Sequence, residues 1–190
     1  MMLSKSVENK IKKEAINFLR QGKEGWDIPH TLSAVKWMKV LIEKEGGDDK
    51  ILIPAIYFHD TGYQQLPLDC TPEEVKKAHL GHAEKGSLIA SKVLPKLNDF
   101  SDKEIIEITR LISAHDKHPA LDDFNHQLVF EADGLAQIDW QNCKPTYSKK
   151  NSSKFLNESF IPWRVKYYKT KTGKKYLDKL IMSAKKYLKE

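Results

Sequence analysis

The feature that most constrains this chain is an apolar segment, Ile51 to Phe58, that ends in the ionisable pair His59-Asp60. The segment carries no charged side chain, and a helix that is apolar on all sides belongs in the interior of a fold. An unpaired imidazole or carboxylate is strongly destabilising there, because it loses its hydration without gaining a partner. The folded chain must therefore supply partners for both His59 and Asp60.

Further polar residues interrupt the apolar side of a helical pattern in the same way, namely His30, His82, His115 and Asp133. At about 100° per residue, each of them shares a helix face with apolar neighbours. A single histidine on such a face is most often a core residue that is bonded to a backbone carbonyl. The ordered set, drawn from separate helices around His59-Asp60, indicates instead a convergence on one or two cations, which would offset the cost of burial.

Helical periodicity interrupted by short breakers predicts an all-α fold. The sequence has no strand-type alternation of useful length, no internal repeat and no low-complexity segment. The expected helices run from Leu3 to Leu19, from Pro29 to Glu45, along the apolar segment before His59, from Thr71 to about Leu94, from Ser101 to His115, around Asp133, and within the segment after Lys144.

Helix starts are marked by capping signals. Thr71 is expected to cap a helix whose first residue is Pro72, and Ser101 with Glu104 forms a capping box. Asp27 is expected to cap the helix that delivers His30 from a loop. Loops over residues 61–69 and 116–125 are expected to form pocket walls, and His126 is assigned to the surface.

The length of 190 residues predicts a single domain over residues 1–190. No apolar run resembles a signal peptide or approaches the ~20 residues that span a bilayer, so we expect a cytoplasmic protein without a membrane partner. Cys70 and Cys143 lack the spacing of metal ligands and are expected to be structurally incidental.

Charge is divided unevenly along the chain. From Lys144 to the end, fourteen basic residues stand against three acidic ones, a balance of +11 that leaves −5 for the rest of a chain whose total is +6. Apolar residues at helical spacing lie between these lysines, which is typical of a solvated helix and disfavours nucleic-acid binding as the primary role. The basic end is still able to attract a substrate that carries phosphate.

The order His30, His59-Asp60, Asp133 resembles the signature of the HD-domain superfamily of metal-dependent phosphohydrolases, and His59-Asp60-Thr61-Gly62 resembles its H-D-x-G form. The resemblance covers about residues 26–138, and the basic segment 144–190 is expected to pack on that core. His82 begins a stretch similar to the H-x-x-x-G of HD members that hold two metals, and His115 ends a helix as their additional histidine does. Tyr63 stands where the cyclic-di-GMP phosphodiesterase branch has lysine, so that branch is disfavoured.

The resemblance implies a site for one or two divalent metal ions. We expect His30, His59 and Asp133 to bind one ion and His82 and His115 a second, with Asp60 bridging ions about 3.5–4 Å apart. Nitrogen and carboxylate donors without a thiolate favour six-coordinate Mn or Fe, while Mg, Co, Ni and Zn stay open. His79 is an alternative ligand to His82.

The function implied is hydrolysis of a phosphate ester of a nucleotide or other small phosphorylated metabolite by a metal-activated water. Asp60 is expected to be catalytic, and Lys85 is a candidate for contacting phosphate or protonating the leaving oxygen, as are Lys117 and His118. Two alternatives stay open: a diiron oxygenase of HD type, and a non-catalytic regulator that binds metal or nucleotide. The oligomeric state is not predicted.

Overall fold

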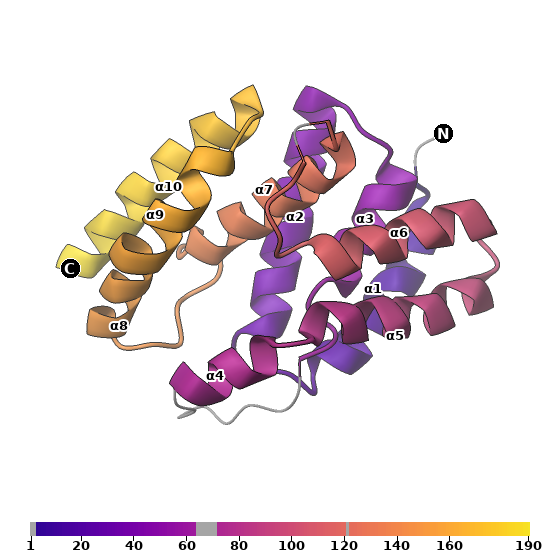
Figure 1. Cartoon of the computed structure of the whole chain (residues 1–190), viewed down its shortest axis with the longest axis horizontal. Coiled ribbons are helices and arrows are strands. Elements are labelled where there is room, and N and C mark those ends of the chain that lie inside the picture. The colour runs from indigo at the N-terminus through magenta and orange to yellow at the C-terminus, as the bar shows by residue number, and fades with distance from the viewer. Residues whose placement is uncertain (1–2, 64–71, 121) are drawn as a thin grey trace.

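The computed structural model describes residues 3–63, 72–120 and 122–190, and all regular structure in these ranges is helical (Figure 1). The prediction of an all-α fold is confirmed. The elements are α1 (Lys5–Leu19), α2 (Asp27–Glu45), α3 (Asp49–Phe58), α4 (Pro72–His79), α5 (His82–Leu97), α6 (Asp102–Ala114), α7 (Phe124–Ile138), α8 (Lys149–Lys154), a π-helix (Phe155–Phe160), α9 (Ile161–Arg164), a 3-10 turn (Val165–Tyr167) and α10 (Lys171–Lys189).

α3 is the centre of the fold. Its residues from Ile51 to Phe58 are all buried, as their apolar character predicts. The helix begins where the Asp48 side chain accepts a hydrogen bond from the Lys50 N–H at 2.9 Å. α1, α2, α5, α6 and α7 all contact α3, so the segment that carries His59-Asp60 is enclosed by other helices.

α2 starts earlier than expected, at Asp27, so the prediction that Asp27 caps this helix from a loop is wrong. Asp27 is buried, and its carboxylate accepts the Lys23 N–H at 2.6 Å, which fixes the chain just before the helix. Pro29 lies in the first turn, where backbone N–H groups have no acceptor within the helix and proline removes no hydrogen bond.

The helix expected from Thr71 to Leu94 is in fact two helices, α4 and α5. Gly81 separates them with a φ of 80°, a backbone conformation that glycine adopts without a steric penalty. This break makes His82 the first residue of α5. The helix then continues through Pro95 to Leu97, beyond the expected stop, because a proline this close to the end removes a single helical hydrogen bond. Thr71, the expected cap, lies outside the described residues.

α6 begins with the predicted capping box, in which the Glu104 carboxylate accepts the Ser101 N–H at 2.6 Å and the Ser101 hydroxyl accepts the Glu104 N–H. The helix ends at Ala114 and places His115 directly after it. His126, expected at the surface, is buried, so that assignment is wrong. Its Nε2–H donates to the Ala114 carbonyl at 2.6 Å, because α7 packs beside the end of α6.

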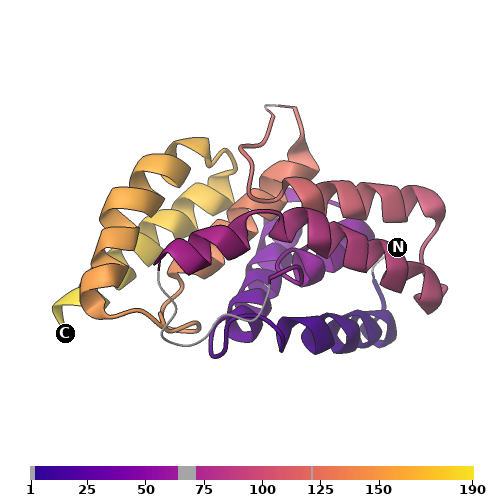
Figure 2. The same cartoon turned by 60° about the horizontal axis from the view of Figure 1, so that its bottom comes forward.

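The C-terminal segment forms a layer at one end of the molecule, in which α8, the π-helix and α9 follow one another in a continuous helical run and α10 lies beside this run (Figures 1 and 2). α10 contacts α7, α2 and α8. Glu131 of α7 fixes the start of α10, because its buried carboxylate accepts the N–H groups of Lys169 at 2.6 Å and Thr170 at 3.0 Å. The layer is therefore attached to the same helix that carries Asp133.

α10 is amphipathic, with Leu177, Leu180 and Ala184 buried and most of its lysines exposed. This arrangement agrees with the solvated helix that the sequence predicts for the basic segment. Among the described residues, no helix combines the length and the apolar character that crossing a membrane requires.

Candidate metal centre

The predicted metal ligands lie at or near helix ends that meet in the interior, except Asp133, which lies within the body of α7. His59 follows the last residue of α3, and Asp60 follows His59. The remaining side chains come from α2, the start of α5, the end of α6 and α7, and the whole set is buried: His30, His59, Asp60, His82, His115 and Asp133. The structure thus brings together residues that are up to about a hundred positions apart in the chain.

These side chains form two groups that each place their donor atoms within 4.8 Å of one another. The first consists of His30, His59 and Asp133, with the His30 Nε2 3.2 Å from the His59 Nε2 and 3.0 Å from an Asp133 oxygen. The second contains His82 and His115, whose Nε2 atoms are 3.1 Å apart, together with Asp60.

Asp60 connects the two groups. One carboxylate oxygen lies 3.3 Å from the His30 Nε2 and 3.2 Å from the His59 Nε2. The other lies 3.5 Å from the His82 Nε2 and 3.4 Å from the His115 Nε2. A carboxylate with one oxygen directed at each group has the geometry that a bridging ligand needs.

The orientation of the imidazoles shows which nitrogen is available to a metal. The Nδ1 atoms of His59, His82 and His115 each contact the backbone carbonyl three residues earlier, at 2.8, 2.6 and 2.7 Å. A carbonyl can only accept a hydrogen bond, so Nδ1 carries the proton and Nε2 presents a lone pair. This is the backbone contact that fixes the tautomer of metal-bound histidines in general.

The facing lone pairs fit a cation. In the His82–His115 pair two nitrogen lone pairs are 3.1 Å apart, an arrangement that is repulsive unless a positive charge lies between them. For metal–nitrogen bonds of about 2.1 Å, this separation subtends about 95°, closer to octahedral than to tetrahedral geometry. Buried His and Asp groups at these distances can therefore hold a metal ion.

Electrostatics keep the carboxylates of the centre ionised. Burial favours the neutral acid, yet His59 and the other histidines hold the pKa of Asp60 well below its usual value. Burial likewise opposes ionisation of Asp133, and Arg164 followed by His30 outweighs it and lowers the pKa. Burial lowers the pKa of His59, but Asp60 and Asp133 reverse this effect and raise it to about 10. The cluster thus stabilises positive charge, which a metal cation can provide in place of a proton.

Two glycines allow the dyad to approach α5 closely. A Cβ on Gly62 would lie 1.9 Å from the His82 carbonyl oxygen, and one on Gly86 would lie 3.0 Å from the Phe58 carbonyl oxygen. Any side chain at Gly62 would therefore separate the end of α3 from the start of α5. The glycines of the H-D-x-G and H-x-x-x-G stretches act together, because they let Asp60 come within reach of His82.

Arg164 contributes to the centre from the C-terminal layer, a role that no local pattern in the sequence indicated. It is 3% exposed, and its Nη2 donates to Asp133 at 2.6 Å. The guanidinium lies 4.5 Å from the centre of the Phe130 ring. A Cβ on Gly134 would lie 2.7 Å from Arg164 Nη1, so the glycine next to Asp133 makes room for this arginine. One oxygen of Asp133 is thereby fixed while the other faces His30.

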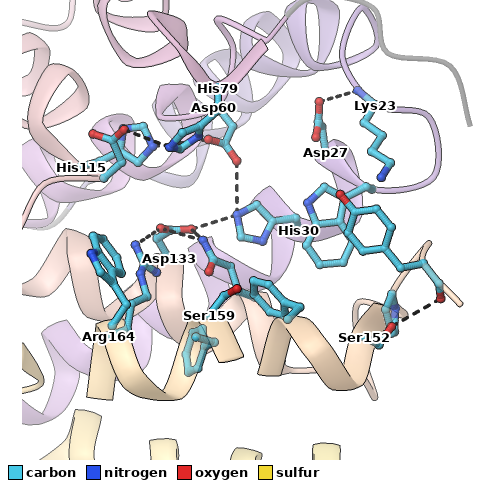
Figure 3. A pocket seen from close by; sticks show the side chains of 18 of the residues that line it. Lys23, Asp27, His30, Asp60, His79, His115, Asp133, Ser152, Ser159 and Arg164 are labelled. Carbon is cyan, nitrogen blue, oxygen red and sulfur yellow. Dashed lines mark hydrogen bonds and ion pairs between the residues drawn. The ribbon is translucent and has the colours of Figure 1, made fainter. Parts of the chain in front are cut away.

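A cavity of about 740 Å³ opens onto this centre (Figure 3). His30, Asp60, His82, His115 and Asp133 all line it. Much of its remaining wall is aromatic and comes from both the core and the C-terminal layer: Trp26, Tyr63, Trp140, Tyr147, Phe155, Phe160 and Trp163. Figure 3 shows Arg164 and Ser159 on the C-terminal side, facing His30 and Asp133, and Ser152 farther away, where its hydroxyl donates to the Tyr147 carbonyl. A small organic molecule can therefore contact the candidate metal centre from within a mainly apolar cavity that is partly open to solvent.

No protein-family model, curated protein or solved structure matches this chain. The side chains of the site therefore carry the functional interpretation. Their donors are histidine nitrogens and carboxylate oxygens without a thiolate, divided into two groups around Asp60.

The lysines predicted to act beside the metals do not line the cavity. Lys85 is exposed on α5, and its predicted contact with phosphate gains no support from this position. Lys117 is exposed and donates to the Ser113 carbonyl at 3.2 Å. His118 stacks on the Tyr167 ring with 3.6 Å between centroids. These residues were candidates because they are close in sequence to His82 or His115. Closeness in sequence does not determine whether a side chain faces the cavity or the solvent.

His79 does line the cavity. Its Nδ1 is 2.9 Å from the Tyr63 hydroxyl, and its Nε2 is 3.5 Å from an Asp116 oxygen. His79 stacks on His82 with 4.6 Å between ring centroids. With His82 and Asp116 it forms a further group of metal-type donors, but its side chain is about half exposed, unlike the buried ligands of the two main groups.

Proposed function

We propose that this chain is a metal-dependent phosphohydrolase of the HD type, which hydrolyses a phosphate ester of a nucleotide or other small phosphorylated metabolite. The observation that carries the proposal is the Asp60 carboxylate, which directs one oxygen at each of two histidine groups whose Nε2 atoms face inward. The order of the ligands along the chain supports the assignment to the HD superfamily.

The chain would hold two ions through two sets of side chains. His30, His59 and Asp133 would bind one, His82 and His115 the other, and Asp60 both. Bound divalent ions supply Lewis acidity that activates water and neutralises charge on phosphoryl oxygens. The nearly right-angled donor arrangement favours Mn²⁺ or Fe²⁺, with Mg²⁺, Co²⁺, Ni²⁺ and Zn²⁺ as further candidates.

The other residues bind, orient and protonate. Arg164 holds Asp133 in one orientation, and backbone carbonyls hold His59, His82 and His115. The aromatic walls exclude water from the bound substrate, which strengthens electrostatic interactions within the cavity. Among the described residues, His79 is a cavity-lining imidazole outside the proposed ligand set, so we assign it, rather than Lys85, the donation of a proton to the leaving oxygen.

The test is a panel of nucleotides and phosphomonoesters assayed with the protein loaded with Mn²⁺, Fe²⁺, Co²⁺ or Mg²⁺. We expect metal-dependent release of phosphate from at least one substrate class and about two ions per chain by inductively coupled plasma analysis. An iron pair that is redox active, with oxygen consumption and no phosphate release, would replace this proposal by the oxygenase alternative. A metal-loaded protein that converts none of the substrates would favour the second alternative, a non-catalytic regulator that binds metal or nucleotide.

The role of His79 has its own test. His79→Gln should lower kcat by about 10²-fold, since that is the usual lower range for the loss of a general acid, while the metal content stays at the wild-type value. Lys85→Gln is the matched control and should leave kcat unchanged. Loss of one ion from the His79 variant would identify His79 as a ligand instead.

A further inference from the structure

Lys23 is a buried lysine that the proposed reaction does not use. It lies between α1 and α2 and is 7% exposed. Its ammonium nitrogen is 3.9 Å from the centre of the Tyr147 ring, and both residues line the cavity. A cation over an aromatic face gains some attraction from the ring, but much less than from an anionic partner.

Among the residues that the structure describes, the ammonium group has no such partner. None of the ion pairs or side-chain hydrogen bonds among the described residues involves it. The neighbouring Asp27 directs its carboxylate at the Lys23 backbone N–H, at 2.6 Å, rather than at the side chain. The Lys23 side chain is buried except where it lines the cavity, so an anionic ligand in the cavity would meet an ammonium group that no described carboxylate neutralises.

The backbone around Lys23 is built to hold this position. The Lys23 carbonyl accepts the N–H groups of Trp26 at 3.1 Å and Asp27 at 3.2 Å. Asp27 is itself buried and approaches so closely that a Cβ on Gly22 would overlap its carboxylate. The turn before α2 is therefore fixed, and with it the backbone position from which the Lys23 side chain extends.

Lys23 is also separate from the metal centre. In Figure 3 the Lys23 side chain lies to the right of His30, whereas Asp60 and His115 lie to its left. The Trp26 ring is stacked on His30, with 5.4 Å between centroids and an interplanar angle of 8°. The wall of the cavity thus includes the candidate metal centre, aromatic side chains and the Lys23 ammonium group.

We propose that Lys23 forms a second anion-binding subsite, so that the substrate carries an oxyanion at the end remote from its scissile phosphate, with an apolar or aromatic portion between. The inference rests on the proposed function, because the metal centre is taken to bind the first phosphate. Substrates with a single anionic group would leave the Lys23 ammonium without a partner and bind more weakly.

Non-hydrolysable ligands of graded length test this subsite. Binding of α,ω-alkylene bisphosphonates to the Mn²⁺-loaded protein is compared, by isothermal titration calorimetry, with binding of alkyl monophosphonates of equal carbon number. We expect one chain length at which the bisphosphonate binds at least about tenfold more tightly, in the range of one charge-assisted contact. Lys23→Met should abolish this gain and leave monophosphonate affinity unchanged, while Lys23→Arg should retain most of it.

Lys166→Met is the matched control, because it removes the same charge from an exposed residue that also lines the cavity. No gain at any chain length in the wild type, or a gain that survives in Lys23→Met, would overturn the subsite. If the tighter binding of the bisphosphonate is lost only in Lys166→Met, the second anion binds to Lys166, and the proposed Lys23 subsite is equally overturned. Failure of every phosphonate to bind the loaded protein would instead contradict the proposed function, and the subsite with it. Metal content and circular dichroism of each variant show whether it is folded.

Discussion

At the scale of single residues, the properties of the site follow from how each donor atom is directed. The histidines at the ends of α3 and α6 and at the start of α5 place Nδ1 against a backbone carbonyl, and that contact leaves only Nε2 for the interior. His30 differs, because its Nδ1 has no hydrogen-bond partner among the described residues and its ring is held by the Trp26 stack. Asp60 is the residue that faces both groups, so its removal has the largest expected effect.

Asp60→Ala should abolish phosphohydrolase activity and most metal binding while the protein stays helical. The expected loss of metal affinity exceeds the roughly 10–100-fold typical of changes to residues that only orient a ligand, because both ions lose a donor. Inductively coupled plasma analysis and far-UV circular dichroism measure the two effects. Glu158→Gln, at another carboxylate that lines the cavity, should keep both ions. Normal metal content in Asp60→Ala would contradict the assignment of ligands.

At the scale of helices, the start of α6 and the contact between α3 and α5 are decided by different kinds of interaction. The capping box at Ser101 is local, since the partners are three residues apart. The approach of α5 to the dyad is tertiary and depends on Gly62 and Gly86 having no side chain. The capping box predicts an effect on the free energy of unfolding, and the close approach of α5 predicts an effect on the metal content as well.

Glu104→Gln should lower the free energy of unfolding at pH 7 by about 0.5–1 kcal/mol, as expected for a cap with a partly exposed ion pair. The bond from Lys50, followed by the Ser101 N–H, lowers the pKa of Glu104 from 4.5 to about 2. A depressed pKa means that this stabilisation is complete above pH 4.5 and is lost as the pH falls toward 2.

Urea denaturation of wild type and variant across this range measures the effect, and the two curves should converge at the acid end. Glu43→Gln is the control, because the exposed Glu43 pairs only with the adjacent Lys44. A stability difference between Glu104→Gln and wild type that does not depend on pH would be evidence against the ion-pair contribution.

Gly62→Ala should disrupt the metal centre, because the new methyl group would overlap the His82 carbonyl. We expect a loss of stability of about 1–3 kcal/mol from overpacking, and fewer bound ions per chain. Gly46→Ala is a matched control: its φ of 90° makes alanine strained, but no atom lies within 4 Å of the added Cβ. That variant should lose stability and keep its metal, so equal metal content in both variants would contradict the role of close packing at Gly62.

At the scale of the whole molecule, the C-terminal layer completes the site that the other helices begin. α9 supplies Arg164 to Asp133, and the segment from Pro145 to Lys166 supplies much of the cavity wall opposite the metal centre (Figure 3). Asp133 binds Arg164, and Glu131 on the same helix binds the Lys169 N–H. The two carboxylates thus hold both ends of the short segment that leads from α9 into α10. Stability of the layer and assembly of the site are therefore expected to be coupled.

Arg164→Met should destabilise the metal-free protein by about 3 kcal/mol, because it leaves the buried Asp133 carboxylate without its closest cation. The loss should be smaller with metal present, since a bound ion also compensates that charge. Urea denaturation with and without Mn²⁺ measures both values. Lys166→Met, which changes an exposed residue two positions away, should cost less than about 0.5 kcal/mol. Equal stability of Arg164→Met and wild type would show that Asp133 does not depend on this ion pair.

The helical segments, the α6 capping box and the set of polar residues turned toward the interior were all predictable from the sequence. They depend on contacts between residues a few positions apart, or on the cost of placing an imidazole or carboxylate on an apolar face. The same cost explains why His30, His59, Asp60, His82, His115 and Asp133 could be named together before their positions were known. Whether they bind metal stays a prediction.

Only the tertiary structure decided the burial of Asp27 and His126, the Arg164–Asp133 ion pair and the position of Lys23 in the cavity. Each depends on which distant segment packs against a residue, and local periodicity contains no record of that partner. Lys23 shows the difference, because Tyr147, whose ring lies 3.9 Å from its ammonium nitrogen, is far away in the sequence. The physical reason is that burial is a property of the packed chain, because it arises when segments far apart in sequence exclude water from the same space.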